Sequence, residues 1–280
     1  MQTSEWVQVV FVLVFAVAAW LTSFTSHALP VHRRWNVTIL AAAAIVIATI
    51  GCYSAPLLAP DHRPILRDCL TVALFLVPYW QTGQFFLGPN IKIQNRLLAF
   101  DQWLLPGISA KSGTERTLVG LILEGAYLLC YPLLPLSLLT VYMTALRGKV
   151  GGFWLVVLVS TYICYAVTPF VPAFPPRSPV GDEADCAVPA GDANKGRIFN
   201  RWILKRGSIH AISFPSAHVA SAFAIALFFL HYSTSLGVIF LVGAVLISLG
   251  AVVGRYHYAL EVLLGAATAL VVYLASYNYL

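Results

Sequence analysis

Polar and ionisable residues gather in three short stretches of an otherwise apolar C-terminal half. Residues 175–177 read Pro-Pro-Arg, residues 214–218 read Phe-Pro-Ser-Ala-His, and residues 254–258 read Gly-Arg-Tyr-His-Tyr, with Glu261 shortly after. An unpaired polar group is costly in apolar surroundings, and a charged group costs more. Two histidines, two arginines, a serine and a carboxylate in such places indicate a functional site.

The stretch around Pro215 predicts the start of a helix. Proline is tolerated in the first helical turn, and serine is common at helix starts. The N–H groups of a first turn lack intrahelical partners and form a natural anion site, which Ser216 and His218 would face. Taken alone, the stretch can also be a helix cap followed by an interfacial histidine.

His257 and Glu261 are four residues apart, so on a helix they share one face. A carboxylate that holds one imidazole nitrogen makes the other a better nucleophile or base. Arg255 comes just before this helix, and a guanidinium suits phosphate oxygens. The His-Glu spacing is not specific by itself.

Arg177 follows two prolines, which end an apolar segment in a stiff extended turn. Alone, it fits an arginine that snorkels to the membrane surface. Together, the three stretches hold what phosphoryl transfer requires: cationic groups for the phosphate oxygens, a nucleophile and a proton donor for the leaving oxygen.

Composition places these residues in an integral membrane protein. Of 280 residues, 59% are hydrophobic and only 10% are charged, and the mean hydropathy is +0.81, far from the values of soluble domains. The net charge of +6 comes from scattered basic residues, so there is no signal for nucleic-acid binding. One polytopic domain is expected, rather than several soluble ones.

Eight apolar segments predict an all-α bundle of membrane helices, since a ~30 Å hydrocarbon core needs roughly 20 residues per crossing. The fourth segment contains Pro132 and Pro135, which predict a kink. It also contains Glu124, either a functional group or a hydrogen-bonded structural carboxyl. The segments are residues 6–25, 36–58, 66–87, 117–145, 152–172, 215–233, 235–254 and 258–279.

Two polar connections differ in character. Residues 90–116 mix charged and apolar side chains in the manner of a helix that lies at the membrane interface. Residues 181–207 form the longest polar loop, rich in Asp, Ala, Gly and Pro, and we expect no fold of its own there.

Segment lengths predict that the motif residues meet. No apolar span separates Arg177 from His218, and His257 follows His218 by 39 residues, about twice the ~20 needed for one crossing. The chain then crosses the membrane and returns. Arg177, His218 and His257 are therefore expected at one membrane surface.

At these residues the chain resembles the type 2 phosphatidic acid phosphatase (PAP2) superfamily, near its inositol phosphorylceramide synthase branch. The family's Pro-Ser-x-His motif is matched by residues 215–218, and its His-Tyr-x-x-Asp-Val-x-x-Gly motif by residues 257–265, over a resemblance that covers about residues 118–275. The resemblance implies a catalytic core of six helices in residues 66–280, and the motifs lie in residues 170–275 of this core. Two further membrane helices are expected in residues 1–65.

The chain departs from the family pattern at three places. Glu261 replaces the usual aspartate, and Arg255 lies closer to the motif histidine than the family's arginine, whose place Ala251 takes. The first motif, a lysine before Arg-Pro, has Phe170 at the lysine position. Arg177 is the expected counterpart of that motif's arginine. Substitutes for the missing lysine are Lys195, Arg197, Arg201, Lys205 and Arg206.

The resemblance implies a mechanism without a metal or cofactor. His257, oriented by Glu261, attacks phosphorus and forms a phosphohistidine, and His218 protonates the leaving oxygen and then activates water or an alcohol. Phosphate oxygens are held by Arg177, Arg255 and the groups around Ser216. The substrate is a lipid phosphate in the membrane: phosphatidate, a polyprenyl phosphate or pyrophosphate, or a phosphoinositide-like donor, with hydrolysis and transfer both open.

Two other classes of protein compete with this interpretation. A membrane transporter would spread polar residues through the depth of the membrane, whereas here they gather at one face. A metal hydrolase could use His218, His257 and Glu261, although the chain has no His-Glu-x-x-His motif.

Two arguments about membrane orientation disagree. The resemblance implies a site on the non-cytoplasmic face of a multi-pass protein. The positive-inside rule favours the opposite, because 13 of the 17 Lys and Arg residues fall on the site's side. The four on the other side are Arg63, Arg67, Arg147 and Lys149.

Overall fold

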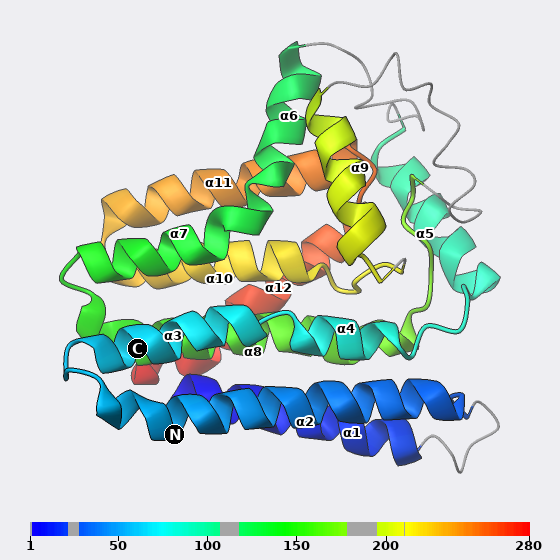
Figure 1. Ribbon diagram of the computed structural model, residues 1–280. Coiled ribbons are helices and arrows are strands. Elements are labelled where there is room, and N and C mark those ends of the chain that lie inside the picture. The colour runs from blue at the N-terminus through cyan, green and yellow to red at the C-terminus, as the bar shows by residue number, and fades with distance from the viewer. Residues whose placement is uncertain (1, 22–27, 107–117, 178–194, 210) are drawn as a thin grey trace.

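The computed structural model describes residues 2–21, 28–106, 118–177, 195–209 and 211–280, which form helices and connecting turns without any strand (Figure 1). This confirms the all-α prediction. The helices are α1 Thr3–Leu21, α2 Val31–Ser54, α3 His62–Leu74, α4 Val77–Gly83, α5 Ile91–Leu104, α6 Leu118–Leu128, α7 Cys130–Met143, α8 Val150–Val167, α9 Lys195–Gly207, α10 Ala217–Tyr232, α11 Thr234–Val253 and α12 Ala259–Ser276.

Five of the described helices are long and apolar enough to cross a membrane: α1, α2, α8, α11 and α12. Helices α6 and α7 form a sixth candidate if the bent pair is one span. Helix α10 is apolar but has only 16 residues. These helices fit a membrane protein with five candidate spans, or six if the bent pair is one span, among the described residues.

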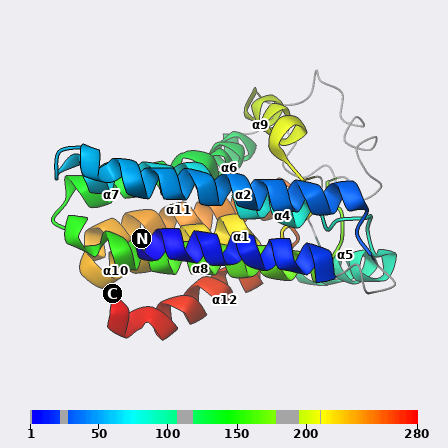
Figure 2. The same cartoon turned by 60° about the horizontal axis from the view of Figure 1, so that its bottom comes forward.

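The core of the bundle lies around α8 and α10. Helix α10 packs against α8, α11 and α12, and the large side chains between them include Phe153, Trp154 and Phe228, all fully buried. Helices α1 and α2 lie side by side, and α1 packs on α8 (Figure 2). Because α10 is enclosed on several sides, its first turn is held firmly at one end of the bundle.

The predicted third span is divided into α3 and α4. Pro78 stands in the first turn of α4, where its missing N–H is tolerated. The polar residues of this region have partners inside the bundle: Asp68 accepts a hydrogen bond from Trp154 Nε1 at 2.8 Å, and Gln81 Nε2 donates to Val12 O at 3.2 Å and Val37 O at 3.0 Å. Side chains that interrupt the apolar segment thus tie it to α8, α1 and α2.

The kink predicted for the fourth segment is confirmed. Helices α6 and α7 meet at 57° around Leu129. Pro132 follows the break, and its missing N–H cannot bond the carbonyl of Leu128. The bend turns α6 away from the direction of α7 (Figure 1), and α6 packs against α11.

The expectation that residues 181–207 have no fold of their own is wrong for their C-terminal part. Helix α9 covers Lys195–Gly207, while residues 178–194 lie outside the described residues. Ile198, Phe199 and Trp202 recur at helical spacing, a signal hidden by the polar composition of the whole segment.

Candidate active site

The three motif stretches meet at one end of the bundle, as the segment lengths predict. The backbone N–H of Arg177 donates to the carbonyl of Arg255 at 3.0 Å. The ring centroids of His218 and His257 lie 5.8 Å apart. The site is thus assembled from the end of the α8 segment, the start of α10 and the turn between α11 and α12.

Glu261 holds the imidazole of His257. Its Oε2 atom lies 2.6 Å from His257 Nδ1, and its Oε1 atom accepts the backbone N–H of Tyr258 at 2.9 Å. Both side chains are buried. The longer arm of glutamate therefore reaches the histidine from the first turn of α12, and the ring is oriented with Nε2 away from the carboxylate.

His257 also lies in a setting that disfavours its charged form. Burial is the larger cause and the charge of Arg177 the smaller one, and together they lower the pKa of His257 from 6.5 to about 3. A neutral imidazole whose Nδ1–H donates to Glu261 leaves a lone pair on Nε2. That is the form needed for nucleophilic attack.

The start of α10 is bound to α12. Ser216 is the N-cap of α10 and accepts the N–H of Val219 at 3.5 Å, while its own N–H donates to the carbonyl of Glu261 at 3.0 Å. The N–H of Ala217 donates to Ser213 Oγ at 3.2 Å. The N–H groups of Ser216, Ala217 and Val219 already have acceptors, so these three do not contribute to the anion site expected at this turn.

Asp101 is a site residue that sequence reasoning missed. Its Oδ2 accepts from Arg255 Nη1 at 3.1 Å and its Oδ1 from the N–H of Ala259 at 2.8 Å. Asp101 is 2% exposed and Arg255 8%. The sequence predicts an interface helix with its charges in solvent over residues 90–116, yet Gln94, Leu97 and Asp101 share the buried face of α5. That helical spacing was the available signal.

Aromatic rings form a wall beside the histidines. Tyr256 stacks on Tyr127 with centroids 4.2 Å apart and planes at 3°, and the guanidinium carbon of Arg177 lies 5.0 Å from the Tyr256 centroid. The ring of His218 lies 6.2 Å from those of Tyr127 and Tyr131. Its Nδ1 atom is buried and has no hydrogen-bond partner in the part of the chain that the structure describes.

Glu124 belongs to the same neighbourhood. Its Oε1 accepts from Tyr256 OH at 2.5 Å and from Asn200 Nδ2 at 3.1 Å. Asn200 Oδ1 in turn accepts from Tyr131 OH at 2.9 Å. Glu124 is therefore a hydrogen-bonded carboxyl. It is connected to the two candidate catalytic histidines through Tyr256, which precedes His257, and through Asn200 and Tyr131, whose ring faces His218.

Of the candidates for the missing lysine, the structure describes the side chains of Lys205 and Arg206. Lys205 and Arg206 are exposed, and Arg206 lies over the ring of Trp202 at 4.5 Å. The side chains of Lys195, Arg197 and Arg201 lie outside the described residues. Among the described residues, no group of three His, Cys, Asp or Glu side chains could hold a metal ion.

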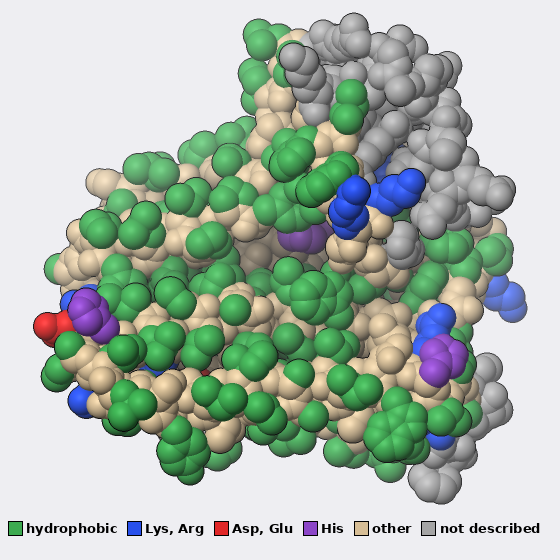
Figure 3. All heavy atoms as spheres, viewed as in Figure 1, with side chains coloured by type: hydrophobic (Ala, Val, Ile, Leu, Met, Phe, Trp, Pro, Cys, Tyr) green, Lys and Arg blue, Asp and Glu red, His purple; other side chains and the backbone are tan. Residues whose placement is uncertain are grey.

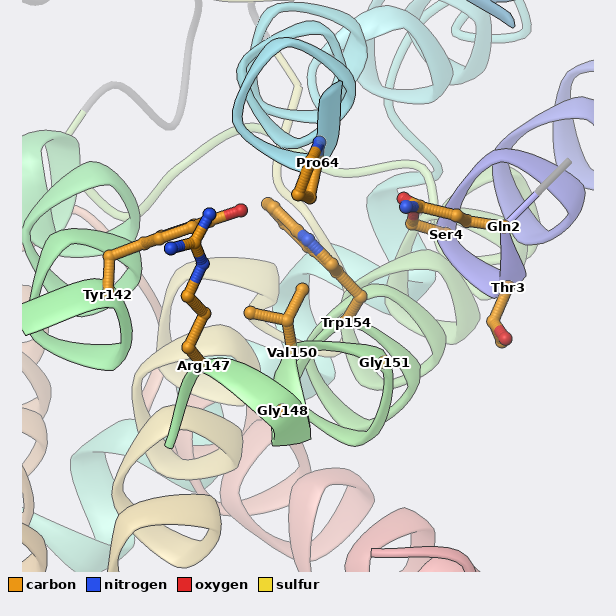
Figure 4. A pocket seen from close by; sticks show the side chains of 10 residues that line it. All are labelled: Gln2, Thr3, Ser4, Pro64, Tyr142, Arg147, Gly148, Val150, Gly151 and Trp154. Atoms are coloured by element: carbon orange, nitrogen blue, oxygen red, sulfur yellow. The ribbon is translucent and has the colours of Figure 1, made fainter. Parts of the chain in front are cut away.

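Figure 3 shows a histidine side chain recessed in a hollow between α7 and α9, close to Lys and Arg side chains. A separate pocket of about 650 Å³ is lined by residues at the starts of α1, α3 and α8, among them Thr3, Pro64 and Arg147 (Figure 4). It lies at the other end of the bundle, and no motif residue lines it. The pocket is therefore not part of the candidate active site.

Comparison with known proteins identifies a family. Residues 95–275 match the model of the PAP2 superfamily, a region that includes Asp101 and every motif residue. No curated protein and no solved structure matches the chain.

Proposed function

Because the chain belongs to the PAP2 superfamily, whose members are phosphoesterases, we propose that it is a membrane lipid phosphatase acting through a phosphohistidine. The observation that carries this proposal is the pairing of two imidazoles: His257, held by a buried carboxylate at 2.6 Å, and His218, whose ring lies 5.8 Å away. A nucleophile and a proton donor on either side of one phosphorus atom are what the reaction requires.

In the first step, Nε2 of His257 forms a bond to phosphorus as the bond to the leaving oxygen breaks. His218, which takes up a proton when the anionic phosphate binds beside it, gives that proton to the leaving oxygen. Glu261 stabilises the positive charge that develops on the His257 ring. In the second step, His218 takes a proton from water, the water oxygen bonds to phosphorus, and the P–N bond breaks to release phosphate.

Arg177, Arg255 and the Ser216 hydroxyl are the proposed phosphate-binding groups. The two arginines are joined through their backbones, so their positions are coupled. Arg255 is fixed by Asp101, and Arg177 by its place over Tyr256. Guanidinium groups prepositioned in this way stabilise the charge on transferring oxygens without reorganising during the reaction.

The substrate we propose is a lipid with a terminal phosphate or pyrophosphate, because the site lies where apolar helices end.

In this proposal α3–α4, α6–α7 and α10 also cross the membrane, which gives the bundle eight crossings, six of them in residues 66–280. The site then faces the non-cytoplasmic side. Reporter fusions within residues 181–193 and after residue 280 test this orientation, and a cytosolic signal from the loop would overturn it.

The function is tested by phosphate release from a panel of phosphatidate, polyprenyl phosphates and polyprenyl pyrophosphates, with purified protein, chelator and orthovanadate as separate arms. We expect vanadate inhibition, no loss with chelator, no turnover by His257→Ala, and a loss of at least about 10²-fold in Glu261→Gln. His231→Ala is the matched control, because His231 contacts Tyr273 away from the motifs and should retain activity.

Three results would change this assignment. Full activity in His257→Ala would remove His257 as nucleophile, and loss on chelation would favour a metal hydrolase. Transfer of the phospho-headgroup to an added acceptor alcohol, in place of water, would identify a phosphotransferase of the inositol phosphorylceramide synthase type, since only the second nucleophile differs.

A further inference from the structure

Helix α9 has two distinct faces. Ile198, Phe199 and Trp202 are 49%, 54% and 53% exposed, and the rings of Phe199 and Trp202 stack at 9°. Asn200 points the other way and is 0% exposed. At about 100° per residue, the three exposed apolar residues share one side of the helix, and Asn200 lies on another.

The buried face is fastened to the active site by polar contacts. The side chain of Asn200 bridges Glu124, at 3.1 Å from its amide nitrogen, and Tyr131, at 2.9 Å from its amide oxygen. Glu124 also binds Tyr256, the residue before His257, and the ring of Tyr131 faces His218 edge-on. One asparagine thus connects α9 to residues that touch both histidines.

The exposed face suits a lipid surface. Helix α9 contacts α6 at the end of the bundle where α10 and α12 begin, which is where lipid headgroups lie if those helices cross the membrane. Lys205 and Arg206 are exposed beside the apolar residues, and Arg206 lies over Trp202. Exposed aromatics with neighbouring cations are typical of helices that lie in the interface.

We propose that α9 is a lipid-surface latch: its exposed face inserts into the headgroup layer of the membrane, and Asn200 transmits that placement to the catalytic residues. When α9 is seated on lipid, Asn200 keeps Glu124, Tyr131 and the turn before His257 in their observed arrangement. Asn200 is a positioning residue in this proposal. The proposal rests on the proposed function only in those tests that measure activity.

The lipid contact is tested without measuring activity. The protein is reconstituted in vesicles of phosphatidylcholine that is brominated on the acyl-chain carbons nearest the headgroup, a quencher of tryptophan emission. Removing Trp202 by Trp202→Phe should lower the quenched fraction of emission from the chain's seven tryptophans. Trp154→Phe, which removes a fully buried ring, should raise it. A rise in Trp202→Phe as well would show Trp202 in water and overturn the proposal.

The latch is tested by exchanging its partners. Asn200→Asp places a second carboxylate beside Glu124, and we expect kcat/KM on lipid phosphate in phosphatidylcholine vesicles to fall about tenfold, the effect of losing one buried hydrogen bond. Adding Glu124→Gln restores an amide–carboxylate pair and should recover most of the loss. The loss should be larger on vesicle lipid than on a water-soluble aryl phosphate.

Several results decide the matter. A double variant as inactive as Asn200→Asp, or equal losses on the two substrates, would overturn the latch. If Asn200→Asp does not fold, Asn200→Ala gives the same comparison. Asn36→Ala is the control, because among the described residues the Asn36 side chain donates a hydrogen bond to Gln84 and none to a motif residue. If the wild type hydrolyses neither substrate, the proposed function fails, while the quenching result still decides the lipid contact.

Discussion

At the scale of single residues, the site depends on a histidine that stays uncharged. Burial and the nearby Arg177 lower the pKa of His257, and Glu261 fixes its ring. In the unfolded chain the same imidazole has an ordinary pKa near 6.5. Folding therefore removes a proton-binding site between the two pKa values, which links stability to pH.

The free energy of unfolding should decrease as the pH falls below about 6.5. Below this pH the imidazole of His257 binds a proton in the unfolded chain but stays neutral in the folded chain. The contribution is at most about 1.4 kcal/mol per pH unit, and it vanishes above pH 6.5. Thermal midpoints of the detergent-solubilised protein should show a shallower acid slope in His257→Gln than in the wild type. Identical slopes in both, with His231→Gln as control, would contradict the lowered pKa.

Residues within the motifs could be found from the sequence, because their types and short spacings carry the signal. His257 and Glu261 are a single helical turn apart. The partners of the motifs could not, since Asp101 is 154 residues from Arg255 and Asn200 is 76 from Glu124. Such pairs become visible only when the helices are placed together.

At the scale of elements, the site depends on the close contact between the starts of α10 and α12. The N–H of Ser216 bonds the carbonyl of Glu261, and a Cβ at Gly265 would lie 2.6 Å from Ser216 O. Only glycine permits this approach. The contact sets the distance between the helix that carries His218 and the helix that carries Glu261.

Gly265→Ala should therefore separate α10 from α12. We expect a loss of stability of about 1–3 kcal/mol from overpacking, together with a fall in kcat/KM, because His218 and Glu261 move apart. Gly243→Ala in α11 is the matched control, since a Cβ there meets nothing within 4 Å. If Gly265→Ala keeps wild-type kcat/KM, the contact does not position the site.

A helix or a break in a helix could be predicted from the sequence where a single residue type determines the local structure. The prolines of the fourth segment foretold the break between α6 and α7. Helix α9 was not predicted because the polar average over residues 181–207 conceals a short amphipathic helix. The large apolar side chains Phe199 and Trp202 are exposed and the polar Asn200 is buried. This is the reverse of the usual pattern, so hydrophobicity alone could not predict the buried face.

At the scale of the whole molecule, α1 and α2 are integrated with the helices that follow. Gln81 in α4 is fully buried and donates to backbone carbonyls of both, and Arg67 in α3 pairs with Glu5 in α1. The expected division into residues 1–65 and 66–280 thus cuts through polar contacts. Apolar segment lengths could not reveal this, because they carry no information about which spans hydrogen-bond each other.

A chain that lacks residues 1–58 should be markedly less stable, because the Gln81 amide is left without its two acceptors at a cost of about 1–3 kcal/mol. Thermal melting in detergent measures the effect. Gln81→Met in the shortened chain should recover part of the loss, whereas in the full chain it should not stabilise. An unchanged melting temperature after truncation would mean that residues 59–280 fold independently.

The Asp101–Arg255 pair also constrains how this sequence can change over time. Arg255 adopts a left-handed backbone conformation with φ of 61°, which costs a non-glycine residue roughly 1–2 kcal/mol. A glycine would relieve that cost, but it would leave Asp101 buried without its cation, a penalty of about 3–5 kcal/mol. If Asp101 is substituted first, the buried guanidinium of Arg255 is left without its carboxylate at a similar cost. Either single substitution is therefore destabilising, and we expect the two residues to be kept or replaced together.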